Sequence, residues 1–480
     1  MKNGVMMQYF EWNLPNDGKF WVQLKNDAKH LSQIGVTSVW IPPAYKADEQ
    51  EDEGYSTYDL FDLGEFEQKN TVRTKYGTKE ELIEAINELH KYQICFYLDV
   101  VMNHKAGADY TERFMVQEVD PENRDNPLSD PYEIEGRTGY DFPGRGNKYS
   151  DFKWNSNHFS GTDKNEANGK CAIYRIIGED KYWSQRVNDE NGNYDYLIRN
   201  DLDLNHPDVV KELNHWGVWV SNELQLDGMR LDAIKHMDDN FIKQFLDTVR
   251  AERGDNFYVV GEYWKGDFDL LKSYLEFMEC KLDLFDVPLH FKMFQVSCQG
   301  RDFDFTDFWD GTLVSHFPEN AVTFVDNHDS QCGSSLESEI ESWFKPQAYG
   351  LILLMEKGYP CIFYGDYYRI GDQDSPHRTI IDTLLGVRQK YAYGEEKSYF
   401  DHCNTVGFTR MGDDDHPGSG LALLLSNGDD GDKVMYVGEH HKGEIWREVT
   451  GSIDDEITIG DDGQALFKVH GGKLAVWIKK

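Results

Sequence analysis

Short runs of β-branched and aromatic residues alternate with amphipathic helical patterns along most of the chain. The clearest helical pattern spans 78–93, where Thr78 and Glu81 form a capping box ahead of an apolar stripe. Between the helical patterns lie eight runs that are apolar almost throughout: 5–10, 37–42, 94–101, 226–231, 257–262, 282–287, 321–326 and 360–365. Strands of this kind, separated by helices, predict a parallel sheet that is covered on both faces. Eight is also the number of strands that closes a TIM (β/α)8 barrel, so we expect an α/β fold of this type.

Two regions depart from the alternation of strands and helices. The segment between the third strand and a helix opening near Pro207 is rich in Gly, Asn, Asp and Tyr, and is far too long for a βα loop. We therefore expect an inserted subdomain after the third strand. Beyond 395 the helical patterns stop and short strands alternate with glycine-rich turns, which predicts a C-terminal all-β sandwich domain. The predicted boundaries are 1–104 and 208–395 for the two parts of the barrel, 105–207 for the insert, and 396–480 for the C-terminal domain.

The chain is strongly acidic, with a formal net charge of −37. Such a charge repels nucleic acids and anionic membranes at long range, so we expect neither as a partner. The first residues lack the basic and apolar regions of a secretory signal, and no apolar run is long enough to span a bilayer. The seven cysteines have neither metal-site nor disulfide-framework spacing, so we expect most of them to be small core residues in a reducing compartment. We expect a cytoplasmic monomer.

Charged residues gather where several predicted strands end. In the stretch LQLDGMRLDAIKH (224–236), Arg230 and Asp232 share the face that points into the barrel, whereas Asp227 has the opposite parity and no role that we can assign. Polar residues also close the third strand in DVVMNH, and Glu262 closes the fifth. The seventh ends in FVDNHD, which contains Asp329. Because active sites of such barrels lie at the carboxyl ends of the strands, we expect these residues to converge there.

Three of these residues, Asp232, Glu262 and Asp329, are carboxylates, and the chain has no phosphate loop, nucleophile elbow or dinucleotide-binding glycine pattern. Retaining glycoside hydrolysis needs one ionised carboxylate and one protonated acid about 5–5.5 Å apart. We expect Arg230 to keep Asp232 ionised by direct pairing. Glu262, near like charges in a partly dry cleft, would be kept protonated and serve as the acid.

Four segments, DVVMNH (99–104), LDGMRLDAIKH (226–236), GEYW (261–264) and FVDNHD (324–329), resemble in this order the four motifs of the α-amylase family, glycoside hydrolase family 13. The stretch DLDLNHPDV (201–209) resembles a further motif at the end of that family's inserted domain. The similarity extends through the whole chain and is greatest to the liquefying-type bacterial α-amylases. It implies endo-acting, retaining hydrolysis of α-1,4-glucosidic bonds in starch, glycogen or maltodextrins.

The resemblance also implies roles for individual residues. Asp232 would be the nucleophile that forms a covalent glucosyl-enzyme, Glu262 the general acid/base, and Asp329 a residue that grips sugar hydroxyls in the transition state. The residues that would bind the substrate are Tyr55, His104, Arg230, Lys235, Trp264 and His328.

A calcium ion between the barrel and the insert is a further implication of the resemblance. Its ligands would be the side chains of Asn103, Asp195 and Asp201 and the main-chain carbonyl of His236, an all-oxygen set that suits a hard cation. Close secreted relatives have a second calcium–sodium cluster built on aspartates, whereas the matching positions here are Ser160 and Ser184. We therefore expect one calcium ion and no second cluster.

Other functions remain open from the sequence. A maltooligosaccharide-forming or transglycosylating enzyme of the same family would share the motifs, and a non-catalytic glucan-binding protein could keep the barrel. The presence of all three carboxylates weighs against the last of these. A metal-dependent lyase of the enolase kind would need carboxylate ligands on consecutive strands and a lysine base, which this chain does not supply.

Overall fold

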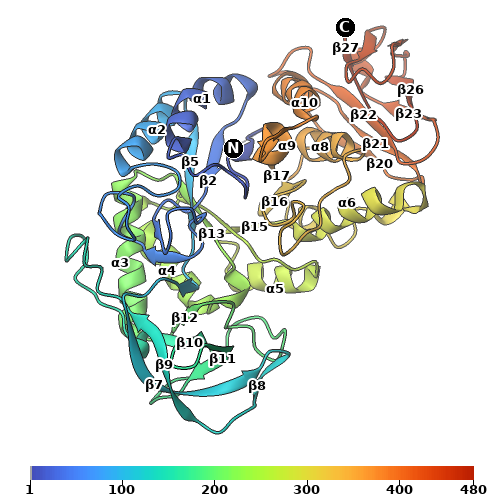
Figure 1. The fold of residues 1–480 in the computed structure, drawn as a ribbon. Helices are drawn as coiled ribbons and strands as arrows, with labels where there is room; N and C mark the ends of the chain where they lie inside the picture. The colour runs from blue at the N-terminus through green and yellow to red at the C-terminus, as the bar shows by residue number, and fades with distance from the viewer. Residues whose placement is uncertain (1–2) are drawn as a thin grey trace. The chain divides into compact units, whose positions relative to one another are not determined.

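The computed structural model describes residues 3–480, and Figure 1 shows the course of the chain. Eight strands form a closed barrel in the order β1-β17-β16-β15-β14-β13-β5-β2. Their bounds are Met6–Gln8 (β1), Ser38–Ile41 (β2), Cys95–Val100 (β5), Gly228–Leu231 (β13), Tyr258–Gly261 (β14), Asp283–Phe285 (β15), Ala321–Phe324 (β16) and Tyr359–Phe363 (β17). Each strand overlaps a predicted apolar run, and the boundaries differ by at most two residues. The predicted barrel is therefore confirmed.

Helices follow the barrel strands along the chain. They are α1 (Phe20–Ile34), α2 (Lys79–Lys91), α3 (Pro207–Glu223), α4 (Asp239–Arg253), α5 (Phe268–Phe277), α6 (Val287–Gln299), α7 (Leu313–His316), α8 (Lys345–Leu354), α9 (Tyr364–Tyr367) and α10 (Arg378–Tyr391). The capping box predicted for α2 is present, with Thr78 and Glu81 each accepting from the other's backbone N–H. Pro207 begins α3, as the sequence predicts. Among residues 3–480, no helix is long and apolar enough to cross a membrane.

The described chain divides into two compact units, each of which is considered by itself. The insert-bearing unit comprises Pro15–Lys29 and Trp40–Trp264, and the tail-bearing unit comprises the remaining described residues. Strands β5, β13 and β14 lie in the first unit, whereas β16, β17 and the C-terminal sheets lie in the second.

A seven-stranded sheet forms the insert, as expected after the third barrel strand. Its order is β6-β12-β10-β11-β7-β8, and β9 also pairs with β7. The bounds are His104–Lys105 (β6), Tyr110–Asp120 (β7), Asn123–Pro127 (β8), Tyr132–Gly139 (β9), Phe159–Asn165 (β10), Lys170–Ile176 (β11) and Asn200–Leu202 (β12). Pairing of β12 with β6 sets Asp201 opposite His104. The insert is therefore hydrogen-bonded to the chain just after it leaves β5.

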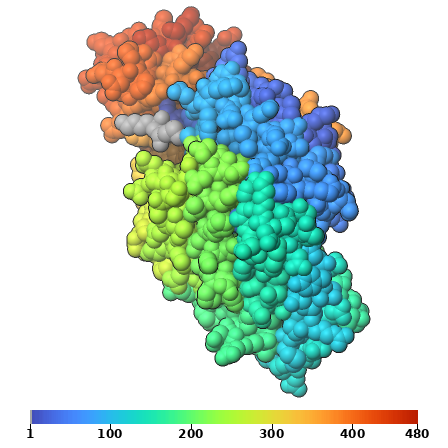
Figure 2. Space-filling view, turned by 90° about the vertical axis from the view of Figure 1, so that its left-hand side faces the viewer, coloured from blue at the N-terminus to red at the C-terminus, as the bar shows by residue number. Residues whose placement is uncertain are grey.

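Helix α3 packs against the end of the insert. The hydroxyl of Ser150 donates to Glu212 Oε1 at 2.5 Å, and His215 Nε2 lies 2.9 Å from the carbonyl of Tyr149. These segments, coloured teal and green, lie side by side in Figure 2. Residues far apart in the sequence thus form one surface of the insert-bearing unit.

The C-terminal region consists of antiparallel sheets, which confirms the predicted all-β domain. A six-stranded sheet has the order β20-β21-β22-β27-β24-β25, and β23 pairs with β26. The bounds are Glu396–Tyr399 (β20), Thr405–Arg410 (β21), Leu421–Ser426 (β22), Gly431–Tyr436 (β23), Ile445–Glu448 (β24), Glu456–Thr458 (β25), Gln464–Val469 (β26) and Leu474–Lys479 (β27). Its core includes Trp446, Phe467 and Trp477, all fully buried.

The expectation that most cysteines are core residues is wrong. All seven are free thiols, but only Cys361 is buried and Cys95 is half-buried. The exposed ones are Cys171, Cys280, Cys298, Cys332 and Cys403. They lie in loops or near the ends of helices and strands, where a small residue contributes little to packing.

Candidate active site

Strand register brings two of the predicted carboxylates to neighbouring positions. Arg230 pairs with Asp99 across β13 and β5, and Leu231 pairs with Gly261 across β13 and β14. The ladders continue one residue further, because Asp232 N–H donates to the Val100 carbonyl and Glu262 N–H donates to that of Leu231, both at 2.9 Å. Asp232 and Glu262 therefore lie directly after the carboxyl ends of adjacent parallel strands, as predicted.

Arg230 is the centre of a buried ionic cluster. Its Nη1 lies 2.7 Å from Asp99 Oδ1 and 2.7 Å from Asp232 Oδ1, and its Nη2 lies 3.4 Å from Glu262 Oε2. Burial opposes the charged guanidinium, but Asp99 and Asp232 outweigh it and raise the pKa of Arg230 well above its ordinary value. The side chain is fully buried, so these contacts are shielded from water and salt. The predicted pairing of Arg230 with Asp232 is present.

Asp99 has more contacts in this cluster than the sequence indicated. Its Oδ2 accepts hydrogen bonds from Trp40 Nε1 at 3.0 Å and from the Tyr55 hydroxyl at 2.9 Å. Burial raises the pKa of Asp99 to about 6, although the charge of Arg230 lowers it. The only sequence signal for this role was the position of Asp99 at the start of DVVMNH, on the face of the strand that points into the barrel. Tyr55, predicted as a substrate-binding aromatic, is thus anchored by its hydroxyl.

The turn after Asp232 holds the side chain of Glu262. Ala233 adopts a left-handed conformation with φ 50° and ψ 36°, which is unfavourable for a residue with a Cβ. This geometry lets its N–H donate to Glu262 Oε2 at 2.7 Å, while Ile234 N–H donates to the Glu262 carbonyl at 3.1 Å. The local strain is therefore used to fix a carboxylate beside Arg230.

His104 is buried next to Tyr55. Its Nε2 lies 2.8 Å from the Tyr55 carbonyl, and a carbonyl can only accept, so the proton is on Nε2. Burial lowers the pKa of His104, which keeps the ring neutral. Nδ1 is then a hydrogen-bond acceptor, and it is buried without a partner among residues 3–480.

Lys235 and Trp264 are also brought together. The Lys235 ammonium lies 3.4 Å from the Trp264 carbonyl, 3.5 Å from Glu190 Oε2 and 5.0 Å above the ring of Tyr194. Trp264 is largely buried. Glu190 and Tyr194 come from the insert, so they were not predictable as neighbours of the strand-end motifs.

His328 and Asp329 belong to the tail-bearing unit, in the loop after β16. His328 Nε2 lies 3.3 Å from Asp329 Oδ2, and Gln8 Nε2 lies 3.0 Å from His328 Nδ1. The side chain of Asn327 accepts the N–H groups of Asp329 and Ser330 at 2.9 and 2.8 Å, which closes a turn around the carboxylate. Their convergence with Asp232 and Glu262 stays a prediction.

The predicted calcium ligands form a buried acidic group in the insert-bearing unit. Asn103 Nδ2 donates to Asp201 Oδ1 at 3.3 Å. Burial raises the pKa of Asp195 to about 8, and burial together with the charge of Asp195 raises that of Asp201 well above its usual range. Two buried carboxylates that disfavour each other's charge are compatible with a hard divalent cation, which would allow both to ionise. The donor set therefore fits calcium.

Ser160 and Ser184 donate hydrogen bonds to neighbouring carboxylates. The Ser160 hydroxyl donates to Asp201 Oδ2, and that of Ser184 donates to Asp238 Oδ2 at 2.7 Å. Nearby, the buried Lys181 ammonium lies 2.7 Å from Asp203 Oδ2. Hydroxyl and ammonium donors thus contact carboxylates here.

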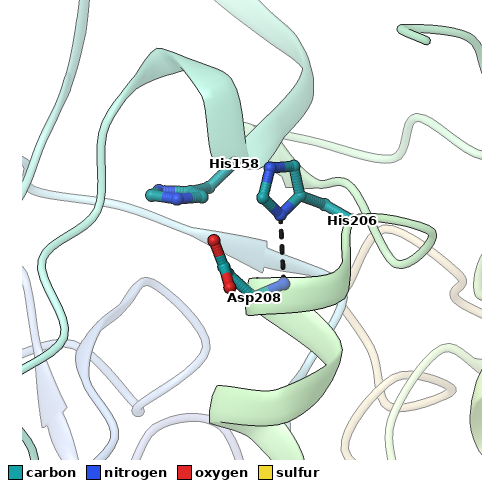
Figure 3. Close-up of side chains that lie close together, drawn as sticks. All are labelled: His158, His206 and Asp208. Carbon is teal, nitrogen blue, oxygen red and sulfur yellow. Dashed lines mark hydrogen bonds between the residues drawn. The ribbon is translucent and has the colours of Figure 1, made fainter.

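A second group, His158, His206 and Asp208, has one potential ligand atom from each residue within 4.8 Å of the others (Figure 3). However, His158 Nδ1 accepts the Asn155 N–H at 3.0 Å and His206 Nδ1 accepts the Asp208 N–H at 3.2 Å. In neutral imidazoles this places both protons on Nε2, whereas a metal needs the lone pair there. These residues therefore do not fit a metal ion.

The chain is similar in sequence to known α-amylases. Residues 24–397 match the α-amylase catalytic domain model. The chain is 48% identical over 480 residues to a glucan 1,4-alpha-maltohexaosidase of Bacillus sp. (strain 707), covering 100% of this chain and 93% of the relative. It is 48% identical over 484 residues to an alpha-amylase of Bacillus licheniformis, covering 100% and 94%, and 40% identical over 492 residues to the cytoplasmic alpha-amylase of Escherichia coli (strain K12), covering 100% and 99%.

Solved structures support the fold. An alpha-amylase from Geobacillus thermoleovorans, complexed with acarbose, superimposes with a TM-score of 0.65 at 17% identity, over 100% of this chain and 98% of that one. From the matched catalytic domain and the full-length relatives, together with the strand-end carboxylates, we conclude that the chain belongs to the α-amylase family.

Proposed function

We propose that this protein is an endo-acting, retaining α-amylase that hydrolyses α-1,4-glucosidic bonds in starch, glycogen or maltodextrins. Members of the family act on α-glucans. The observation that carries the proposal is the contact of Arg230 with both Asp232 and Glu262 at the ends of adjacent barrel strands. It supplies an oriented carboxylate and a second carboxyl group beside it, the pair that retaining hydrolysis requires.

Asp232 is the proposed nucleophile. Arg230 holds Oδ1, and Oδ2 has no hydrogen-bond partner among residues 3–480, so we assign Oδ2 as the atom that attacks the anomeric carbon. The glycosidic oxygen takes a proton from Glu262 and leaves with the remainder of the glucan. A covalent glucosyl-enzyme results, with inverted configuration at the anomeric carbon.

Glu262 then acts as the base. It removes a proton from a water molecule, whose oxygen attacks the anomeric carbon and releases Asp232, so the original α configuration returns. Ala233 N–H and Arg230 both contact Oε2, and these contacts orient the carboxyl group of Glu262. Asp329, held in the Asn327 turn, is proposed to bind sugar hydroxyls as the ring distorts.

The proposed substrate-binding residues differ in what they offer. His104 is proposed to contact a sugar hydroxyl, and Lys235 presents ammonium donors. The remaining members of the proposed set are Tyr55, Arg230, Trp264 and His328. Because neutral donors and acceptors dominate, the set suits an uncharged glucan.

α-Amylases typically bind calcium. We propose one calcium ion, held by Asn103, Asp195, Asp201 and the carbonyl of His236, and no second calcium–sodium cluster. The bound ion would supply positive charge that stabilises both buried aspartates in their ionised forms. Metal analysis of dialysed protein tests the number of ions, and three tightly held ions per chain would contradict it.

We also propose a cytoplasmic monomer without nucleic-acid or membrane partners. The relative named cytoplasmic alpha-amylase, 40% identical over the full chain, supports the location. The net charge of −37 supports the absence of polyanionic partners.

A second candidate is a maltooligosaccharide-forming enzyme, which the relative named maltohexaosidase favours. Timed digestion of amylose, with and without a calcium chelator, separates the alternatives when products are resolved by chromatography and their anomers by NMR. Early products of mixed length with the α anomer first support the proposal. One dominant product length from the start favours the second candidate, whereas β anomers or absent hydrolysis would overturn the proposal.

A further inference from the structure

Three alternate residues contact His328: Gln8 at the end of β1, and Phe10 and Trp12 in the segment that follows. Gln8 Nε2 lies 3.0 Å from His328 Nδ1. The ring centroid of Phe10 lies 5.0 Å from that of the imidazole, and Trp12 stacks on it at 5.7 Å with an interplanar angle of 17°. Residues two apart on an extended chain share a face, so the side chains on one face of this segment contact His328.

Glu11 and Trp12 connect the same segment to the loop that carries His328. Trp12 N–H donates to Gln331 Oε1 at 3.3 Å, and Gln331 Nε2 donates to Glu11 Oε2 at 3.4 Å. Glu11 Oε1 also accepts the Gly371 N–H at 3.0 Å. All of these residues lie in the tail-bearing unit. The position of Gln8 relative to His328 is therefore fixed from several directions.

The direction of the hydrogen bond determines which nitrogen of His328 carries the proton. An amide nitrogen can only donate, so Nδ1 accepts, and the proton of the neutral ring is on Nε2. Nε2 lies 3.3 Å from Asp329 Oδ2, which places an N–H beside a carboxylate. With the Gln8 amide rotated, Oε1 would accept from a protonated Nδ1, and in a neutral ring the Nε2 lone pair would then face the carboxylate, a repulsive contact.

This arrangement leaves one polar atom of the Gln8 side chain without a hydrogen bond to the described residues. The side chain is 1% exposed, and its Oε1 has no hydrogen-bond partner among residues 3–480. A buried unpaired carbonyl oxygen is unfavourable for folding. The amide is thus engaged through its donor end alone, toward His328.

We propose that Gln8 is a positioning residue that holds His328 as the neutral tautomer with its proton on Nε2, and so keeps an N–H directed at Asp329. The proposal rests on the function assigned above, in which Asp329 binds sugar hydroxyls during the reaction. Gln8 need not touch the substrate, because it acts through the imidazole.

The test combines ¹⁵N NMR of histidine-labelled protein with steady-state kinetics on maltooligosaccharides. The His328 signals are identified by their loss in His328→Asn. In the wild type we expect an unprotonated Nδ1 and a protonated Nε2. In Gln8→Met, of similar length but without a donor, both tautomers should be populated, with kcat reduced about tenfold and KM changed less than twofold. Gln8→Glu should move the proton to Nδ1, because an acceptor replaces the donor.

Gln347→Met is the matched control, because Gln347 is equally buried and uses its amide for one bond, to the Gly472 carbonyl at 2.8 Å. It should leave both kcat and the His328 tautomer unchanged. A protonated Nδ1 in the wild type would overturn the proposal, as would Gln8→Met with wild-type kcat. Wild-type protein that hydrolyses no glucan would instead refute the assigned function, and the tautomer in the NMR spectrum would still decide the role of Gln8.

Discussion

Replacement of Lys345 by methionine tests the ionic network behind the Asp329 loop. The Lys345 ammonium is buried at the start of α8, 3.1 Å from Asp326, 2.9 Å from Glu339 and 2.5 Å from Asp366. Asp326 in turn accepts a hydrogen bond from the Ser330 hydroxyl at 2.8 Å, in the loop that carries Asp329. Lys345→Met keeps most of the side-chain volume and removes the only lysine or arginine that pairs with Asp326 and Asp366 among residues 3–480.

The expected loss follows from the burial of these groups. Side chains of Asp326 and Asp366 are at most 2% exposed, and removal of one partner from a buried ion pair costs about 3–5 kcal/mol. The unfolding entropy of 480 residues is about 1 kcal/mol/K near 60 °C, so the melting temperature should fall by about 3–5 °C if the whole chain unfolds together. Lys345→Arg, which keeps the charge, should lose less.

The destabilisation by Lys345→Met is expected to depend on pH. Burial raises the pKa of Asp326 to about 7 even though Lys345 lowers it, so the loss of Lys345 raises that pKa further. The folded state then binds a proton that the unfolded state releases near pH 4, and stability falls as the pH rises from there through the folded-state pKa. The destabilisation by Lys345→Met should therefore be larger at pH 8 than at pH 5.

Differential scanning calorimetry at both pH values measures this effect. The exposed pair of Lys272 with Glu276, 3.9 Å apart on α5, provides the matched control, and Lys272→Met should change the unfolding free energy by less than about 0.5 kcal/mol. A loss below 1 kcal/mol for Lys345→Met, or an equal loss at pH 5 and pH 8, would refute the reasoning.

Three further predictions concern the chemistry. Asp232→Asn should lower kcat at least 10⁴-fold with an unchanged melting temperature, and activity within tenfold of wild type would refute the nucleophile assignment. Glu262→Gln should reduce hydrolysis of maltooligosaccharides by 10²–10⁴-fold but that of α-glucosyl fluoride far less, because fluoride leaves without a proton; equal losses would contradict the acid role. Removal of calcium by a chelator should lower the melting temperature, and Asp201→Asn should lower it without chelator; a chelator effect of the same size in Asp201→Asn would place the ion elsewhere.

Much of the architecture can be predicted from local patterns in the sequence. Near-continuous apolar runs located all eight barrel strands, because strands buried on both faces need apolar side chains in both directions. Strand parity also placed Arg230 beside Asp232, since residues two apart point the same way on a strand. These properties depend on neighbours in the sequence, and the sequence therefore determines them directly.

Contacts between distant segments were decided by the tertiary structure alone. Asp227, which had no predicted role, accepts hydrogen bonds from His90 Nε2 at 2.9 Å and Phe96 N–H at 2.8 Å, linking the start of β13 to α2 and β5. Asp99 likewise gains the donors of Trp40 and Tyr55. Periodicity reports which face a residue occupies but not which residue from another segment lies opposite.

The sequence by itself thus determined the barrel, the all-β tail and the strand-end carboxylates at Asp232 and Glu262. The tertiary structure decided how those carboxylates are held, through Ala233 and Asp99, and which nitrogen of His328 faces Asp329, through Gln8. The physical reason is that a hydrogen bond has a direction and a length of about 3 Å. Both are set only when segments that are separated in the sequence pack together.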